Sequence, residues 1–156
     1  MGKKKPYSER SDLDKLRAQW KKTSGFLERE EWSSAVVRAA TAAEIAANHY
    51  IREELRKKRG LEESFVDHLL KWSNGIDGKL RNLIVPLSKE NGNTKHINAL
   101  KKKVEEINKV RNSIVHQGQF KKESTARHIA TKAREVILGF VKEHKANFTL
   151  PKVKNT

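Results

Sequence analysis

The stretch WSSAVVRAATAAEIAANHY, residues 32–50, decides the fold class. Its apolar residues recur at three- and four-residue steps, as one face of a helix requires. These residues are Trp32, Ala35, Val36, Ala39, Ala42, Ala43, Ala46 and Tyr50. Most of them are alanine, so a partner helix can approach this face closely. Because neither glycine nor proline occurs from Phe26 to Arg59, we expect one helix over that range, ended by Gly60.

Helical periodicity continues on both sides of this stretch. Ser11 is a candidate N-cap for a helix that ends near Ser24-Gly25. A third helical region is expected from Leu61 to about Glu90, with apolar residues at helical spacing. Asn74-Gly75 and Pro86 should break or kink this region, since glycine and proline interrupt helices.

Two more helices are expected after the turn at residues 91–93. The first begins near Thr94 and continues to Gln117, with Gly118 as a natural residue just past its end. The second is expected to be capped by Ser124 and carries an apolar face as far as Val141. No run alternates apolar and polar residues as a strand would. We therefore predict an all-α fold, an up-and-down bundle of four to five helices.

The length of 156 residues fits one domain. We expect residues 1–10 to form a basic, flexible N-terminal segment and residues 11–147 to form the helical bundle. Residues 148–156 are expected to be a basic C-terminal tail. Trp20, Trp32 and Trp72 fall on apolar stripes and are predicted to lie in the core, although an exposed one could stack on a base.

Composition excludes several classes of protein. There is no cysteine, which excludes disulfide frameworks, thiolate zinc sites and a cysteine nucleophile. No apolar run approaches the roughly 20 residues of a membrane span, and the basic start leads into no apolar segment of a secretory signal. We therefore expect a cytoplasmic protein without a membrane partner. The net charge of +15 favours polyanions such as RNA, held without base readout.

One position breaks the apolar pattern of the helix expected over residues 94–117. Its seam is Ile97, Leu100, Val104, Ile107, Arg111 and Ile114, so a guanidinium stands where leucine or isoleucine is expected. Burying that charge is costly unless an anion meets it. Arg111 could extend its charged end to solvent, or pair with a carboxylate such as Glu44 of a neighbouring helix. It could also bind an anion of a substrate.

Two polar residues accompany Arg111. Asn112 and His116 lie four residues apart and therefore share a helix face. His116 comes just before the expected helix end, where the helix dipole favours an imidazolium. Arg111 and His116 lie about 140° apart on an ideal helix. The reach of arginine could nevertheless bring both side chains to one anion.

The segment Arg111-Asn112-Ser113-Ile114-Val115-His116 resembles the signature of the HEPN superfamily, an arginine separated from a histidine by four to six residues. The resemblance covers roughly residues 11–147 of an all-helical chain. It implies a metal-independent endoribonuclease that works as a homodimer, with the motifs of both subunits facing one another and Arg111, Asn112 and His116 as site residues. Many relatives are toxins or antiviral defence effectors, which implies a neutralising antitoxin or a defence-complex partner. Some toxins of the family carry a modified tyrosine two residues past the histidine, where this chain has Gly118.

The chemistry of RNA cleavage agrees with this assignment. Histidine suits the removal of a proton from the 2′-hydroxyl and the protonation of the leaving 5′-oxygen. Arg111 would neutralise charge on the phosphate oxygens, and Asn112 could orient His116 or hold the phosphate. A concerted cut needs an acid and a base, yet each chain has one motif histidine, so a two-fold dimer would supply both.

No cofactor or metal is expected. The other histidines are scattered over different helices without the spacing of metal ligands, and we interpret them as surface or packing residues. They are His49, His68, His96, His128 and His144. Two alternative functions remain open: a non-catalytic nucleic-acid-binding helical protein, and a protein-interaction module of a larger defence complex.

Overall fold

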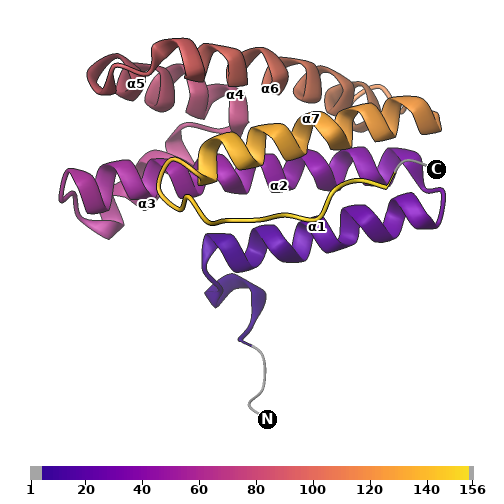
Figure 1. Cartoon of the computed structure of the whole chain (residues 1–156), viewed down its shortest axis with the longest axis horizontal. Coiled ribbons are helices and arrows are strands. Elements are labelled where there is room, and N and C mark those ends of the chain that lie inside the picture. Colours follow the sequence, from indigo (N-terminus) through magenta and orange to yellow (C-terminus); the bar gives the residue numbers. More distant parts are fainter. Residues whose placement is uncertain (1–4, 155–156) are drawn as a thin grey trace.

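The computed structural model describes residues 5–154, and within this range the chain is helical without strands (Figure 1). The α-helices are α1 (Asp12–Glu28), α2 (Trp32–Arg52), α3 (Glu63–Trp72), α4 (Gly75–Lys79), α5 (Val85–Asn91), α6 (Thr94–Val115) and α7 (Glu123–Val141). A short 3₁₀ turn, η1 (Tyr7–Glu9), precedes them, and two π-helical segments lie between them, η2 (Glu53–Lys58) and η3 (Leu80–Ile84). The predicted all-α helical bundle is confirmed.

Helix α2 is the centre of the bundle. It packs against α1 on one side and α7 on the other, and α6 lies across α7 and α2 (Figure 1). The face predicted from residues 32–50 is buried except at Trp32, which is half-buried; its alanines Ala35, Ala39, Ala42, Ala43 and Ala46 have no exposed surface. Small side chains on a central helix let three partners approach its backbone closely, which explains why alanine dominates this face.

The junction between the first two helices differs from the prediction. Helix α1 begins after the N-cap Ser11, as expected, but it passes through Gly25 and ends at Glu28. The buried Leu27 continues its apolar face, and that packing outweighs the weak helix propensity of glycine. The chain turns at Glu30, whose φ of 60° lies in the left-handed region, and α2 begins at Trp32 rather than at Phe26.

Of the predicted interruptions in the third region, the one at Asn74-Gly75 is present, whereas Pro86 does not end the helix. Helix α3 ends at Trp72, and Gly75 starts α4 with a positive φ of 74°. Pro86 lies at the start of α5, a position that tolerates proline. The π-helical η3 directly before it changes the helix register, so the chain stays helical through the proline.

The start of α7 is set by a tertiary contact instead of the predicted cap. Ser124 is not the N-cap; α7 begins at Glu123 and its N-cap is Lys122, whose side chain makes no capping bond. The backbone amide of Lys121 donates to Ser33 Oγ of α2 at 2.9 Å. This bond fixes the entry of the chain two residues before α7, which sequence periodicity could not show.

Residues 148–154 run extended along α1 and α7 (Figure 1, yellow). Phe148 and Leu150 are buried, and Trp20 Nε1 donates to the carbonyl oxygen of Pro151 at 2.9 Å. Arg134 Nη2 donates to the carbonyl oxygen of Leu150 at 2.8 Å. The described part of the expected C-terminal tail is therefore packed on the bundle. The remainder, residues 155–156, and residues 1–4 of the expected N-terminal segment lie outside the described residues.

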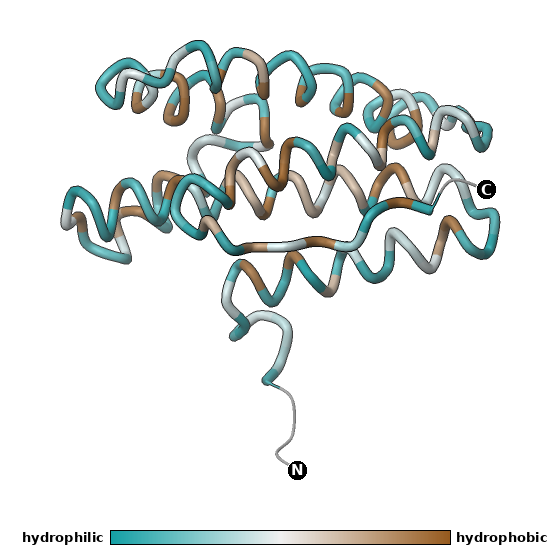
Figure 2. The backbone as a smooth tube through the Cα atoms, viewed as in Figure 1, coloured by the Kyte–Doolittle hydropathy of each residue, from teal (hydrophilic) through white to brown (hydrophobic). Residues whose placement is uncertain are grey.

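The tryptophans are not all in the core. Trp20 is buried and Trp32 is half-buried, but Trp72 is 65% exposed and its neighbour on α3, Phe65, is 49% exposed. The prediction of a buried Trp72 was wrong because the short α3 buries only the face that carries Val66 and Leu70. Brown apolar turns at the protruding α3 are visible beside teal polar ones in Figure 2.

Candidate functional site

The Arg–x4–His motif lies at the end of α6, where the buried seam opens to solvent. Ile97, Leu100, Val104 and Ile107 are buried, as predicted, whereas Arg111 and Ile114 further along the seam are half-buried. The seam position of Arg111 therefore marks the edge of the core. This placement lets the aliphatic stem of the arginine cover apolar surface while its guanidinium stays accessible.

Arg111 has no acidic partner in the part of the chain that the structure describes. Its Nη1 donates to Asn112 Oδ1 at 3.1 Å, and no carboxylate of residues 5–154 lies within 4 Å of its guanidinium. The alternative that Arg111 pairs with Glu44 does not hold, because Glu44 Oε1 accepts from Lys79 Nζ at 2.8 Å. Glu44 thus forms a structural ion pair with the nearly buried Lys79, and the charge of Arg111 is available to an anion.

His116 is the C-cap residue of α6, and its side chain is exposed. Its backbone amide donates to the Asn112 carbonyl at 2.9 Å. Gly118 then ends the helix with a φ of 66°, as predicted, and its amide donates to the carbonyl of Ile114 at 3.1 Å. Arg111 and Asn112 are thus in contact within one chain, whereas no interaction joins either side chain to that of His116 among the described residues.

A shallow pocket of about 340 Å³ adjoins the motif. Ile114 lines it together with residues from the end of α1 and the start of α2: Phe26, Ser33, Ser34, Val37 and Arg38. Arg38 Nη1 donates to Gln19 Oε1 at 3.3 Å, and no carboxylate of residues 5–154 pairs with it. Sequence reasoning missed Arg38 and the two serines, because only the packing of α2 against α6 brings them near the motif.

Two apolar side chains in or near the motif are exposed. Val115 is 47% exposed and Phe120, in the connection to α7, is 94% exposed. Neither lies on the predicted seam, and sequence periodicity gave no role to either. Large apolar side chains beside a charged site are typical of surfaces that another molecule covers.

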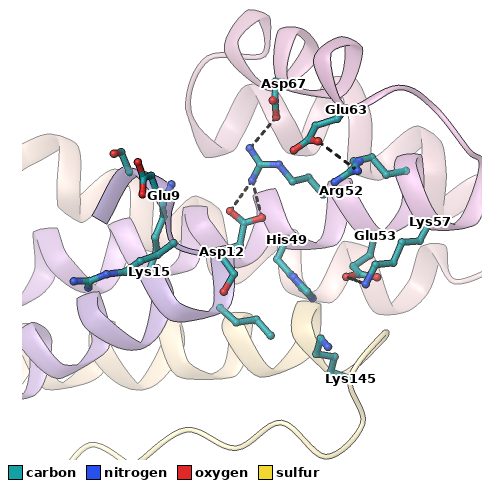
Figure 3. Close-up of a pocket in the computed structure, with 15 residues that line it drawn as sticks. Glu9, Asp12, Lys15, His49, Arg52, Glu53, Lys57, Glu63, Asp67 and Lys145 are labelled. Carbon is teal, nitrogen blue, oxygen red and sulfur yellow. Dashed lines mark hydrogen bonds and ion pairs between the residues drawn. The ribbon is translucent and has the colours of Figure 1, made fainter. Parts of the chain in front are cut away.

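A second charged region lies between the start of α1, the end of α2 and α3, around a pocket of about 570 Å³ (Figure 3). Arg52 is held between two carboxylates, with Nη1 2.6 Å from Asp12 Oδ1 and Nη2 3.2 Å from Asp67 Oδ1. Lys57 pairs with Glu53 at 2.9 Å on the same side of the molecule. Because acidic and basic groups satisfy one another here, we interpret this cluster as a structural link between α1, α2 and α3.

His49 lines this pocket and leads to a prediction about how the stability of the fold depends on pH. The residue is 5% exposed, and its buried Nε2 has no hydrogen-bond partner in the described part of the chain. Burial lowers the pKa of His49 below its usual 6.5, although Glu53 and Asp12 oppose this shift. Below pH 6.5 the unfolded chain therefore binds a proton more readily than the folded one, and stability falls as the pH drops. We expect His49→Gln to flatten this loss in urea unfolding between pH 7.5 and 5, whereas His68→Gln on an exposed histidine should leave it unchanged.

A buried carboxylate joins three segments of the chain, and no sequence pattern pointed to it. Glu54, in η2, is 4% exposed. Its oxygens accept from Arg59 Nη1 at 2.8 Å and from Asn91 Nδ2 at 3.0 Å, and Oε1 lies 3.2 Å from His144 Nε2. Burial raises the pKa of Glu54, but the hydrogen bonds from Arg59 and Asn91 outweigh it, so the pKa is lowered. Glu54 therefore ties η2 to the end of α5 and to the segment after α7.

Residues 5–154 contain no group of three or more histidine, aspartate or glutamate side chains placed to hold a metal ion. None of the described helices is long and apolar enough to cross a membrane. No family model, curated protein or solved structure matches this chain.

Proposed function

We propose that this protein is a metal-independent endoribonuclease that acts as a homodimer, with Arg111, Asn112 and His116 of both subunits forming one composite site. The observation that carries the proposal is a guanidinium without a carboxylate partner within residues 5–154, at the edge of the core and five residues before an exposed histidine. The resemblance of residues 111–116 to the HEPN signature supports the same reaction. It also supports a role as a toxin or antiviral defence effector, held in check by a neutralising partner protein in the cytoplasm.

The proposed reaction is an internal transfer within RNA. One neutral His116 takes the proton of the 2′-hydroxyl while the 2′-oxygen attacks the adjacent phosphorus. The bond from phosphorus to the 5′-oxygen breaks, and a protonated His116 gives its proton to that oxygen. The products are a 2′,3′-cyclic phosphate and a 5′-hydroxyl end. Arg111 stabilises the charge that develops on the non-bridging oxygens through two parallel N–H donors, while Asn112, bonded to Nη1, orients the guanidinium.

The dimer is proposed because one chain supplies one motif histidine. A two-fold axis beside the end of α6 would place two copies of His116 around one phosphate. The exposed Val115 and Phe120 would be buried in such an interface, at a gain of about 25 cal/mol per Å² of apolar surface. Sedimentation velocity of the purified protein should therefore give a dimer.

The products of cleavage test the proposed function. Purified protein incubated with structured and unstructured RNAs in EDTA should give cyclic phosphate and 5′-hydroxyl ends, because neither proton transfer requires a metal. Replacement of the 2′-hydroxyl by hydrogen at the cut position should abolish cleavage there, since the nucleophile is removed. Products are identified by end-labelling and mass spectrometry.

Two results would contradict the proposal. Cleavage that stops in EDTA and returns with Mg²⁺ would indicate a metal-dependent nuclease. Binding of RNA without any product would favour the second candidate function, a non-catalytic RNA-binding protein. The observation that favours this second candidate is the lack of contact between Arg111 and His116 within one chain.

A further inference from the structure

The outward face of α6 carries three lysines that no acidic residue within 5–154 neutralises. Lys95, Lys102 and Lys109 are exposed, and none has a carboxylate within 4 Å among residues 5–154. Their neighbours differ: Lys101 lies 3.9 Å from Glu105, and Lys103 lies 3.0 Å from Glu135 of α7. We call Lys95, Lys102 and Lys109 the lysine track.

The spacing of the lysine track leads to the candidate site. Positions 95, 102, 109 and 116 are seven residues apart, so each side chain is displaced by only about 20° around the helix from the one before it. Neighbouring positions lie about 10 Å apart along the axis, and the row from Lys95 to His116 spans about 31 Å. The lysine track and the motif histidine therefore form one row along α6.

A groove accompanies the first half of this row. It has a volume of about 770 Å³ and lies between α6 and α7, which run side by side in Figure 1. Its lining is formed by Thr94, Lys95, Asn98, Ala99, Lys102, Lys103, Glu106 and Lys132. Lysines line the groove from both helices, Lys95, Lys102 and Lys103 from α6 and Lys132 from α7.

The acidic groups near this groove are already engaged. Glu106 lies against His128 of α7. Glu135 is shared by Lys103, at 3.0 Å, and Lys132, at 3.8 Å. Burial raises the pKa of Glu135, but its contacts with these two lysines outweigh that and lower it, so the carboxylate stays ionised and paired. Lys95 and Lys102 of the lysine track are therefore left as unpaired positive charges that line the groove, and Lys109 continues the row beyond it.

We propose that the lysine track and this groove bind the phosphate backbone of single-stranded RNA and lead the strand to His116. This inference rests on the proposed function, because the row of lysines ends at His116, the proposed catalytic residue. A row of point charges suits a regularly charged chain and reads no bases. A membrane surface fits less well, because the lining of the groove contains no large apolar side chain to insert between lipids.

The test is binding of an uncleavable RNA, so that it does not depend on catalysis. A 2′-O-methyl RNA within the 4–16 nucleotides typical of single-strand grooves, about 12, is titrated by fluorescence anisotropy at several salt concentrations. The triple variant Lys95→Gln/Lys102→Gln/Lys109→Gln should bind about 100-fold more weakly at 0.1 M salt. Its slope of log affinity against log salt should be smaller by about 2, from 0.7 per lost phosphate contact.

The matched control removes the same number of positive charges, but from lysines that lie outside the groove and away from the lysine track. Lys22→Gln/Lys57→Gln/Lys71→Gln, at exposed lysines of α1, η2 and α3, should change the affinity by less than about threefold, because a long-range field is screened beyond about 10 Å at this salt. If both triple variants lost RNA affinity equally, the affinity would depend only on net charge, and the proposed role of the lysine track would be overturned.

The outcomes separate the two proposals. Loss of RNA binding in the track variant, together with a wild type that cuts no RNA, would overturn the proposed nuclease and support the lysine track. A track variant that binds RNA like the wild type would overturn the lysine track even if the wild type cuts RNA. Wild-type binding to vesicles of phosphatidylserine and phosphatidylcholine without binding to RNA would also overturn it.

Discussion

Replacement of His116 by alanine is expected to lower the rate of RNA cleavage by at least 10²–10⁴-fold, the usual contribution of one general acid or base. The loss should lie toward the upper end or beyond it, because a two-fold dimer loses its acid and its base together. Helicity and melting temperature should stay close to those of the wild type, since the side chain is exposed and has no partner within residues 5–154. Single-turnover cleavage of a labelled RNA measures the effect.

Variants of Arg111 test the same site in the same cleavage assay. Arg111→Lys keeps the charge but cannot donate two parallel bonds to a phosphate, so it should recover little of the activity lost in Arg111→Ala. His68→Ala is the matched control, because His68 is an exposed histidine on α3. Full activity of His116→Ala would overturn the assignment of the site. Equal loss in His68→Ala would indicate a general effect of removing surface histidines.

Glu54→Ala is expected to lower the free energy of unfolding by about 3 kcal/mol, because it leaves the donors of Arg59, Asn91 and His144 without their acceptor in a buried position. For a chain of this size that corresponds to a drop in melting temperature of about 10 °C. Urea and thermal unfolding followed by circular dichroism measure both quantities.

The control for Glu54 is Glu90→Ala. Glu90 also pairs with Arg59, at 3.2 Å, but its side chain is 73% exposed, so its removal should cost less than about 1 kcal/mol. The pH dependence gives a further check. Because the pKa of Glu54 is lowered in the fold, its stabilisation is present above its usual 4.5 and is lost as the pH falls through the lowered value. The difference between wild type and Glu54→Ala should therefore shrink in acid.

The helices could be predicted where periodicity and local signals agree. The alanine face of α2, the seam of α6 and the glycine that ends α6 all follow from spacing and from the conformational freedom of Gly118. The start of α7 and the turn at Glu30 could not be predicted, because a contact from Ser33 and the burial of Leu27 decide them. Local propensity is a weak guide wherever a distant contact competes with it.

The same limit applies to the candidate site. Periodicity identified Arg111 because a charge on an apolar seam is visible in the sequence. It did not identify Arg38, which reaches the motif only through the packing of α2 against α6, or the lack of a carboxylate partner for Arg111 among the described residues. Glu54 was missed because nothing in a run of charged residues shows which of them becomes buried.

The extended segment over α1 has a consequence for how the chain acquires its structure. Trp20 Nε1 bonds to the carbonyl of Pro151, 131 positions away, and Arg17 Nη1 reaches the carbonyl of Thr149. During translation α1 therefore emerges from the ribosome long before the segment that covers it. Until then the indole N–H of Trp20 lacks the carbonyl acceptor that this segment supplies, and folding must close a loop nearly as long as the protein.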